Sequence, residues 1–180
     1  MRYFLTRGEP SEPRILVVES GSRSISDQLL PRLYSRFGGN VPIDLITCFS
    51  GVPGNCDPRA RVYRVSEYQG RAGRRKLFRE LAARRYSILA MLCSAEPIMT
   101  KWKWALAARL PVKVLVVNEN CDCFWLDYAH HAAIRHFVAF RAGLTGSGAA
   151  ATLASLVLFP FTLTYLLLYA ATVHIRRALR

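Results

Sequence analysis

The chain has 180 residues, 52% of them hydrophobic, and a formal net charge of +13. About 145 residues precede a long apolar run near the C-terminus, which is enough for one ordinary domain with a core and too few for two. Five cysteines, an odd number without a repeated CxxC spacing, argue against a disulfide framework, so we expect free thiols and no metal site.

Residues 1–13 form an N-terminal tail without the apolar core of a signal peptide, so we expect no cleaved leader and a cytoplasmic domain. Residues 14–123 alternate short β-branched runs with stretches of helical periodicity. Strands are predicted at 14–19, 43–48, 62–65, 87–93 and 112–117. This order predicts an α/β fold, a Rossmann-like parallel sheet of about five strands with flanking helices.

The helices between these strands have their own signals. Ser24 and Asp27 have the spacing of a capping box at the start of the first helix. Pro31 predicts that this helix either begins near Gln28 or is kinked. Residues 68–85 surround a narrow apolar face with arginines, which predicts a surface helix with a basic outer side.

The loop after the first strand is made of small residues around one arginine. Open α/β sheets bind ligands at the carboxyl ends of their strands, and the backbone N–H groups of a helix N-terminus can hold a phosphate. We therefore predict a ligand site at Ser20, Gly21, Ser22, Arg23 and Ser24, with a simple tight turn as the alternative. The pattern is neither GxGxxG nor a Walker motif, so no nucleotide or other cofactor is specified.

Three carboxylates could add chemistry to that loop. Glu96 and Glu119 follow the fourth and fifth predicted strands, which places them at the same sheet edge, where they could bind sugar hydroxyls or act as acid and base. Asp27 is a candidate general base beside the loop. Helix capping by Asp27 and Glu96, and solvation of Glu119, are the alternatives, so the catalytic residues stay unassigned.

Residues 124–142 mix aromatic side chains with His and Arg, which predicts an amphipathic helix at the level of the lipid headgroups. A last helix packed on the sheet is the alternative. Cations and indoles on one helix also favour a membrane interface or a sugar-stacking face. The predicted contacts with membrane or glycolipid are Lys101, Trp104, Arg135, Arg141, Arg176 and Arg177.

Residues 143–175 contain no Lys, Arg, Asp or Glu and precede a basic tail, 176–180. The run exceeds the roughly 20 apolar residues that a helix needs to cross a bilayer, so it is predicted to be a membrane segment. Pro160 leaves three geometries open: one span, a re-entrant or surface-lying element, and a buried soluble helix. Beside a bilayer the net charge favours anionic lipids as partners and disfavours nucleic acid.

The order of segments from 14 to about 120 resembles the N-terminal half of glycosyltransferase family 9, the ADP-heptose:lipopolysaccharide heptosyltransferases. The matching segments are Arg14–Val18, Leu29–Leu33, Ile43–Ile46, Arg64–Val65, Gly73–Leu77, Arg84–Tyr86 and Ala107–Pro111. In that family a Gly-Asp pair after the first strand supplies the catalytic base. Here Ile25 takes the place of the carboxylate, and Asp27 stands two residues later.

The resemblance implies one Rossmann-like half of a GT-B glycosyltransferase, without the donor-binding domain. A complete GT-B site lies between two domains, so the resemblance implies a binding or accessory subunit in envelope glycan or glycolipid assembly. Its implied partners are a lipid-linked glycan and a transferase subunit at the cytoplasmic face of the inner membrane. Two other functions stay open: an active membrane-bound transferase that uses Glu96 or Asp27, and a module that binds only proteins.

Overall fold

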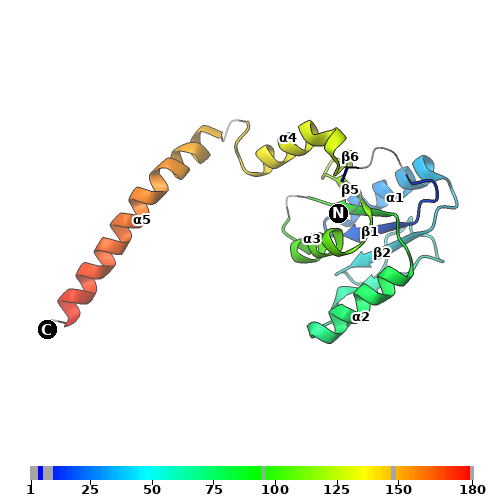
Figure 1. The fold of residues 1–180 in the computed structure, drawn as a ribbon, viewed down its shortest axis with the longest axis horizontal. Helices are drawn as coiled ribbons and strands as arrows, with labels where there is room; N and C mark the ends of the chain where they lie inside the picture. Colours follow the sequence, from blue (N-terminus) through cyan, green and yellow to red (C-terminus); the bar gives the residue numbers. More distant parts are fainter. Residues whose placement is uncertain (1–3, 6–9, 95, 147–148, 179–180) are drawn as a thin grey trace. The chain divides into compact units, whose positions relative to one another are not determined.

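The computed structural model describes residues 4–5, 10–94, 96–146 and 149–178. The chain divides into two compact units, Met1–His131 and Ala132–Arg180, and each is described by itself. The first unit contains a six-stranded sheet in the order β3-β2-β1-β4-β5-β6 (Figure 1). The second contains two helices.

Five strands of the sheet are parallel and confirm the predicted α/β fold. Four of them are buried at every position, as expected when helices cover both faces of a sheet. Ile15 of the central strand pairs with Ile43 on one side and with Ile88 on the other. The parallel strands are β1 (Ile15–Glu19), β2 (Ile43–Thr47), β3 (Val62–Arg64), β4 (Ile88–Leu92) and β5 (Lys113–Val117).

The sixth strand, β6 (Cys123–Trp125), was not predicted and runs antiparallel to β5. Trp125 is buried opposite Leu115, so this aromatic residue belongs to the core of the sheet domain. The segment predicted as an amphipathic helix over 124–142 therefore becomes helical later. A short helix, η2 (Tyr128–His130), leads into α4 (His131–Arg141), which has no buried residue.

Three helices connect the parallel strands: α1 (Arg23–Phe37), α2 (Gly70–Ala83) and α3 (Thr100–Arg109), with a short helix η1 (Val65–Glu67) before α2. The predicted capping box is wrong, because α1 begins one residue before Ser24 with Ser22 as its N-cap. The helix also neither begins at Gln28 nor stops at Pro31, which lies inside it. Leu77 and Leu81 are buried while the arginines of α2 are exposed or half-buried, as predicted.

The C-terminal helix, α5 (Ala149–Ala178), runs without a break through Pro160. Its segment from 149 to 175 could cross a membrane by length and composition. At about 1.5 Å per residue this segment is about 40 Å long, against about 30 Å for the hydrocarbon core of a bilayer. The described helix has no turn at Pro160, so it does not form a re-entrant hairpin. Its large apolar side chains are exposed.

Candidate functional site

The sheet reverses its strand order beside β1. From β1 the chain builds outward through β2 to β3, then crosses back to place β4 on the other side of β1. Open α/β sheets bind ligands outside the carboxyl ends of their strands at such a reversal. The segments that follow β1 and β4 therefore define the candidate site, which we call the carboxyl edge.

Glu19, the last residue of β1, is the central group of the carboxyl edge. Its side chain is fully buried, and its Oε1 atom accepts a hydrogen bond from Arg23 Nε at 3.3 Å. Its Oε2 atom has no hydrogen-bond partner within the part of the chain that the structure describes. A buried carboxylate oxygen without a partner is destabilising, so its presence favours a functional role over a structural one.

Lys103 of α3 is a second buried charge at this edge, with 5% of its surface exposed. Its Nζ atom donates to the backbone carbonyl of Leu92, the last residue of β4, at 2.8 Å. Ser20 Oγ donates to the same carbonyl, also at 2.8 Å. One carbonyl therefore ties α3 to the residue that follows β1.

Both Glu19 and Lys103 act on the pKa of the Cys48 thiol. Burial raises the pKa of this thiol most, a backbone hydrogen bond lowers it, the Glu19 carboxylate raises it, and Lys103 lowers it. Cys48 follows β2, the neighbour of β1. Glu19 and Lys103 thus contribute opposite charges to the same end of the sheet.

Arg23 is the half-exposed member of this charged group. Its Nε atom contacts Glu19, and its Nη2 atom donates to the carbonyl of Ser50 at 3.1 Å. A Cβ atom at Gly51 would lie 3.3 Å from Arg23 Nη1. The arginine therefore links the buried carboxylate to the loop after β2, and it is the cation of the pair that solvent reaches.

Asp27 holds the same loop from its other end. Its Oδ1 atom accepts from Gly54 N at 2.9 Å, and its backbone carbonyl accepts from Asn55 Nδ2 at 2.8 Å. That carbonyl would normally bond to the N–H of the residue four positions later, which is Pro31 and has none. Asn55 replaces the missing donor, so Asp27 is a loop anchor, and the hypothesis that it is a general base loses support.

Gly21 explains why the loop after β1 is built of small residues. A Cβ atom at this position would lie 2.8 Å from Ser94 Oγ, in the segment that follows β4. Ser94 Oγ is itself buried and has no hydrogen-bond partner among the described residues. The two loops are thus in close contact, and each neighbouring strand end carries one unpartnered polar atom.

The predicted ligand residues divide into two groups. Arg23 contacts Glu19, Ser20 shares the Leu92 carbonyl with Lys103, and Gly21 lies against Ser94. Ser22 and Ser24 are exposed and share a hydrogen bond of 2.8 Å between their hydroxyls. The predicted carboxylates Glu96 and Glu119 are both exposed. Nothing in the described contacts joins either of them to Glu19 or Arg23.

Glu19 and Lys103 were missed by the sequence reasoning, although each had a signal. Glu19 ends an otherwise apolar strand, where an acidic residue has the appearance of a solvated strand end. Lys103 stands three, four and seven residues before the buried Leu106, Ala107 and Leu110, which places it on the buried face of α3. That spacing could have identified it as a buried cation.

The predicted membrane contacts are spread over three helices. Lys101 and Trp104 are exposed on α3, Trp104 by 49%. Arg135 is exposed on α4, and the Arg141 guanidinium lies over the Phe137 ring at 5.2 Å. Arg177 is exposed on α5, and the side chain of Arg176 lies outside the described residues. Contact of these residues with lipid stays a prediction.

The cysteines do not assemble into a centre within the residues described. All five are free thiols, and no group of three His, Cys, Asp or Glu side chains there could hold a metal ion. The buried Cys121 thiol donates weakly to the Ile25 carbonyl at 3.5 Å. This contact packs the segment before β6 against the first turn of α1.

The carboxyl edge thus combines two cations, one buried carboxylate and the N-terminus of α1, whose N-cap Ser22 makes no side-chain cap. Such an arrangement can hold an anionic group. Comparison with protein-family models, with curated proteins and with solved structures found no match. The resemblance to glycosyltransferase family 9 therefore rests on the pattern of segments alone.

Proposed function

We propose that the chain is a membrane-attached domain, similar to the N-terminal half of a GT-B glycosyltransferase, that binds a phosphate-bearing glycolipid at the carboxyl edge. It acts as a binding or accessory subunit of envelope glycan assembly, with its sheet domain in the cytoplasm. The observation that carries the proposal is the set of charges at the strand-order reversal: the buried Glu19 and Lys103 and the half-exposed Arg23.

The charges of this group favour an anionic ligand. Arg23 contacts the Glu19 carboxylate, Lys103 is bound to the carbonyl at the end of β4, and the first turn of α1 contains no acidic residue. The helix dipole and the N–H groups of that turn add positive potential at the same place. Arg23 is held by Glu19 but is half-exposed, so its guanidinium can contact a phosphate while the carboxylate orients it.

The chemistry of the edge favours binding over catalysis. Ile25 occupies the place of the carboxylate in the family pattern, and Asp27 is engaged with the loop at Gly54 and Asn55. Glu19 is fully buried and paired with Arg23. A transferase needs a base that can reach the acceptor hydroxyl, so a partner subunit would supply both the donor site and the base.

Membrane attachment is supported by α5 and by charge. The helix could cross a bilayer by length and composition, and the chain carries a net charge of +13. A basic domain held beside anionic lipid gains roughly 1 kcal/mol for each cation near the surface. A phosphorylated glycolipid in that bilayer is then available at high local concentration.

The test is binding of a deacylated, bisphosphorylated glucosamine disaccharide to the full chain in neutral detergent micelles. Arg23→Ala removes the exposed cation and is expected to weaken binding about 10- to 100-fold, the value of a charge-assisted hydrogen bond. Lys103→Met should weaken it as well. Arg59→Ala, at an arginine that pairs only with the exposed side of Asp57, is the matched control and should bind normally.

Three outcomes contradict the proposal in different ways. In the first, the wild type, Arg23→Ala and Lys103→Met bind the disaccharide equally while all three are folded by circular dichroism. The carboxyl edge is then not the binding site. Sugar transfer by the purified chain alone makes it an active transferase. Absence of disaccharide binding together with a stable protein partner favours the module that binds only proteins.

A further inference from the structure

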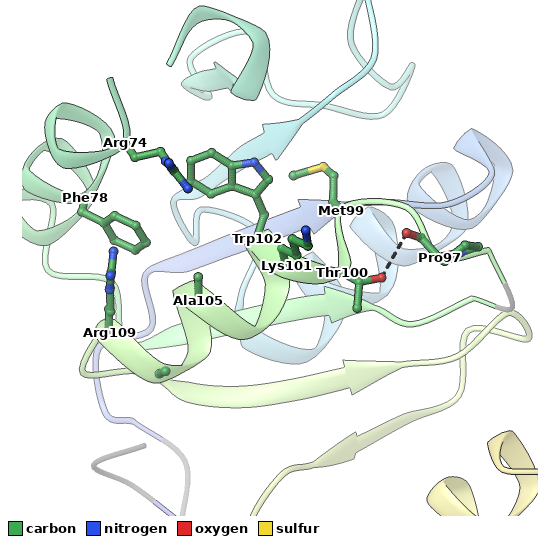
Figure 2. Close-up of a pocket in the computed structure, with 10 residues that line it drawn as sticks. Arg74, Phe78, Pro97, Met99, Thr100, Lys101, Trp102, Ala105 and Arg109 are labelled. Carbon is green, nitrogen blue, oxygen red and sulfur yellow. Dashed lines mark hydrogen bonds between the residues drawn. The ribbon is translucent and has the colours of Figure 1, made fainter. Parts of the chain in front are cut away.

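A groove lies between α2 and α3, and its described lining does not include Glu19, Arg23 or Lys103 (Figure 2). It contains a cavity of about 860 Å³ whose lining includes Arg74, Phe78, Lys101, Trp102 and Arg109. A second cavity of about 640 Å³ shares Phe78 and Arg109 and continues along the helices. Both are lined only by residues from α2, α3 and the segments next to α3.

The floor of the groove is apolar. The rings of Phe78 and Trp102 are stacked with their centroids 6.2 Å apart, and Figure 2 shows both side chains entering the groove from opposite helices. Ala105 and Ala108 line the same cavity, and their small side chains keep the surface of α3 open.

The rim of the groove is cationic. Arg74, Lys101 and Arg109 line the first cavity, and Arg75 and Arg79 line the second. None of the described lining residues of either cavity is acidic. The described contacts of Arg74 and Arg109 are internal: Arg74 Nε donates to Gly70 O at 3.1 Å, and the Arg109 guanidinium lies over the Phe78 ring at 4.8 Å.

An apolar floor between guanidinium groups matches an amphiphile with an anionic head. The floor accepts a hydrocarbon chain, and the rim pairs with a phosphate. A nucleic acid would also meet arginines and a ring, but the helix α5 of the same chain favours a lipid, because a tethered domain meets lipid at every encounter.

We propose that the groove between α2 and α3 binds one anionic phospholipid, with its phosphate between Arg74 and Arg109 and an acyl chain on Phe78 and Trp102. The site uses none of Glu19, Arg23 and Lys103. It shares with the proposed function only the membrane attachment. The lipid would hold the α2–α3 face of the sheet domain at the bilayer surface.

The experiment reconstitutes the full chain in phosphatidylcholine vesicles that contain phosphatidylglycerol with brominated acyl chains, which quench indole fluorescence on contact. The Trp102 signal is the difference between the wild type and Trp102→Phe, so the exposed Trp104 and the buried Trp125 cancel. Brominated phosphatidylglycerol is expected to quench this signal, whereas brominated phosphatidylcholine in the same proportion is expected to leave most of it.

Two variants test the two halves of the groove. Arg74→Gln with Arg109→Gln should weaken the apparent affinity for phosphatidylglycerol about 30-fold, from the loss of two cations near an anionic lipid. Ala105→Phe keeps every charge, adds no indole and blocks the floor, and should abolish the preference for the anionic lipid. Arg59→Gln with Arg61→Gln removes the same charge elsewhere and is the control, expected to behave as the wild type.

The proposal is overturned if both brominated lipids quench Trp102 equally, or if the control pair loses as much affinity as the groove pair. It is also overturned if a short single-stranded oligonucleotide, and not the lipid, quenches Trp102. Arg23→Ala should leave the lipid signal unchanged, and the groove pair should leave disaccharide binding unchanged. Failure of one site is therefore distinguishable from failure of the other.

Discussion

The two ends of the parallel sheet treat buried charge differently. At the amino end Asp44, near the start of β2, accepts from Arg61 N at 2.8 Å through Oδ1 and from Tyr86 Oη at 2.5 Å through Oδ2. Lys113, at the start of β5, pairs with Asp127 Oδ2 at 3.1 Å. Every carboxylate oxygen in this group has a partner, since Asp127 Oδ1 contacts His130 Nδ1 at 2.6 Å.

At the carboxyl end Glu19 Oε2 and Ser94 Oγ are buried without partners in the described chain. Removing one partner of a satisfied buried charge is destabilising, because the other partner is left unpaired. A buried polar atom that already lacks a partner weakens the fold. The comparison indicates that the amino end is built for stability, and it agrees with the proposed binding role of the carboxyl end. Substitutions at the two ends should therefore change different measured quantities.

The largest expected effect is at the amino end. Asp127→Ala leaves Lys113 buried without its carboxylate, and removing one partner of a buried ion pair typically costs about 3–5 kcal/mol of the free energy of unfolding. Denaturant unfolding of the full chain in detergent measures it. Asp57→Ala, which breaks the solvent-accessible pair with Arg59, should cost much less. Similar losses in the two variants would contradict the assignment of stability to the amino end.

A smaller effect follows when Asp127 is protonated and not removed. Burial raises the pKa of this carboxyl, but the hydrogen bonds from His130 and Lys113 outweigh burial and lower the pKa below its ordinary value. The stabilisation is therefore present above the unfolded pKa of about 3.9 and is lost as the pH falls through the lower, folded pKa. Unfolding curves below pH 4 should be steeper with pH for the wild type than for Asp127→Asn.

The sequence predicted those parts of the fold whose pattern is carried by neighbouring residues. The parallel strands are short and mostly apolar, β3 excepted, and Leu77 and Leu81 identified the buried face of α2. The three-residue strand β6 was missed because Phe124 and Trp125, read with the histidines after them, have the composition of an interfacial helix. Only pairing with β5 decides between the two, and pairing is a non-local property.

The candidate site was predicted in part for the same reason. The loop at Ser20 to Ser24 was predicted as a ligand site from its small residues after the first strand, and ligand binding there stays a prediction. The role of Asp27 was not legible, since it depends on a loop 27 residues away and on the donor that Pro31 lacks. Burial of Glu19 depends on which elements cover it and lies outside any local pattern, whereas the spacing of Lys103 from the buried Leu106 and Leu110 was a local signal that was missed.

Glu19→Gln tests the carboxyl end with a change that keeps the shape of the side chain. One oxygen of Glu19 has no partner among the described residues. Removing the charge should therefore either lower the free energy of unfolding by less than about 1 kcal/mol or raise it. Arg23 loses a charged partner, so binding of the phosphorylated disaccharide should fall by about tenfold or less. A large loss of stability with unchanged binding would reverse the roles given to the two ends.

The smallest expected effect is on the reactivity of Cys48, which reports the charges of the carboxyl end without a ligand. Burial first, and then the Glu19 carboxylate, raise the pKa of this thiol, so little thiolate is present at neutral pH although the residue is exposed. Glu19→Gln removes the negative charge and should speed alkylation of Cys48 by iodoacetamide, whereas Lys103→Met removes the positive charge and should slow it. Peptide mapping separates Cys48 from the other four cysteines, and the exposed Cys123 serves as the internal control. Because the two substitutions change the rate in opposite directions, a general loosening of the fold, which would speed both, cannot imitate the result.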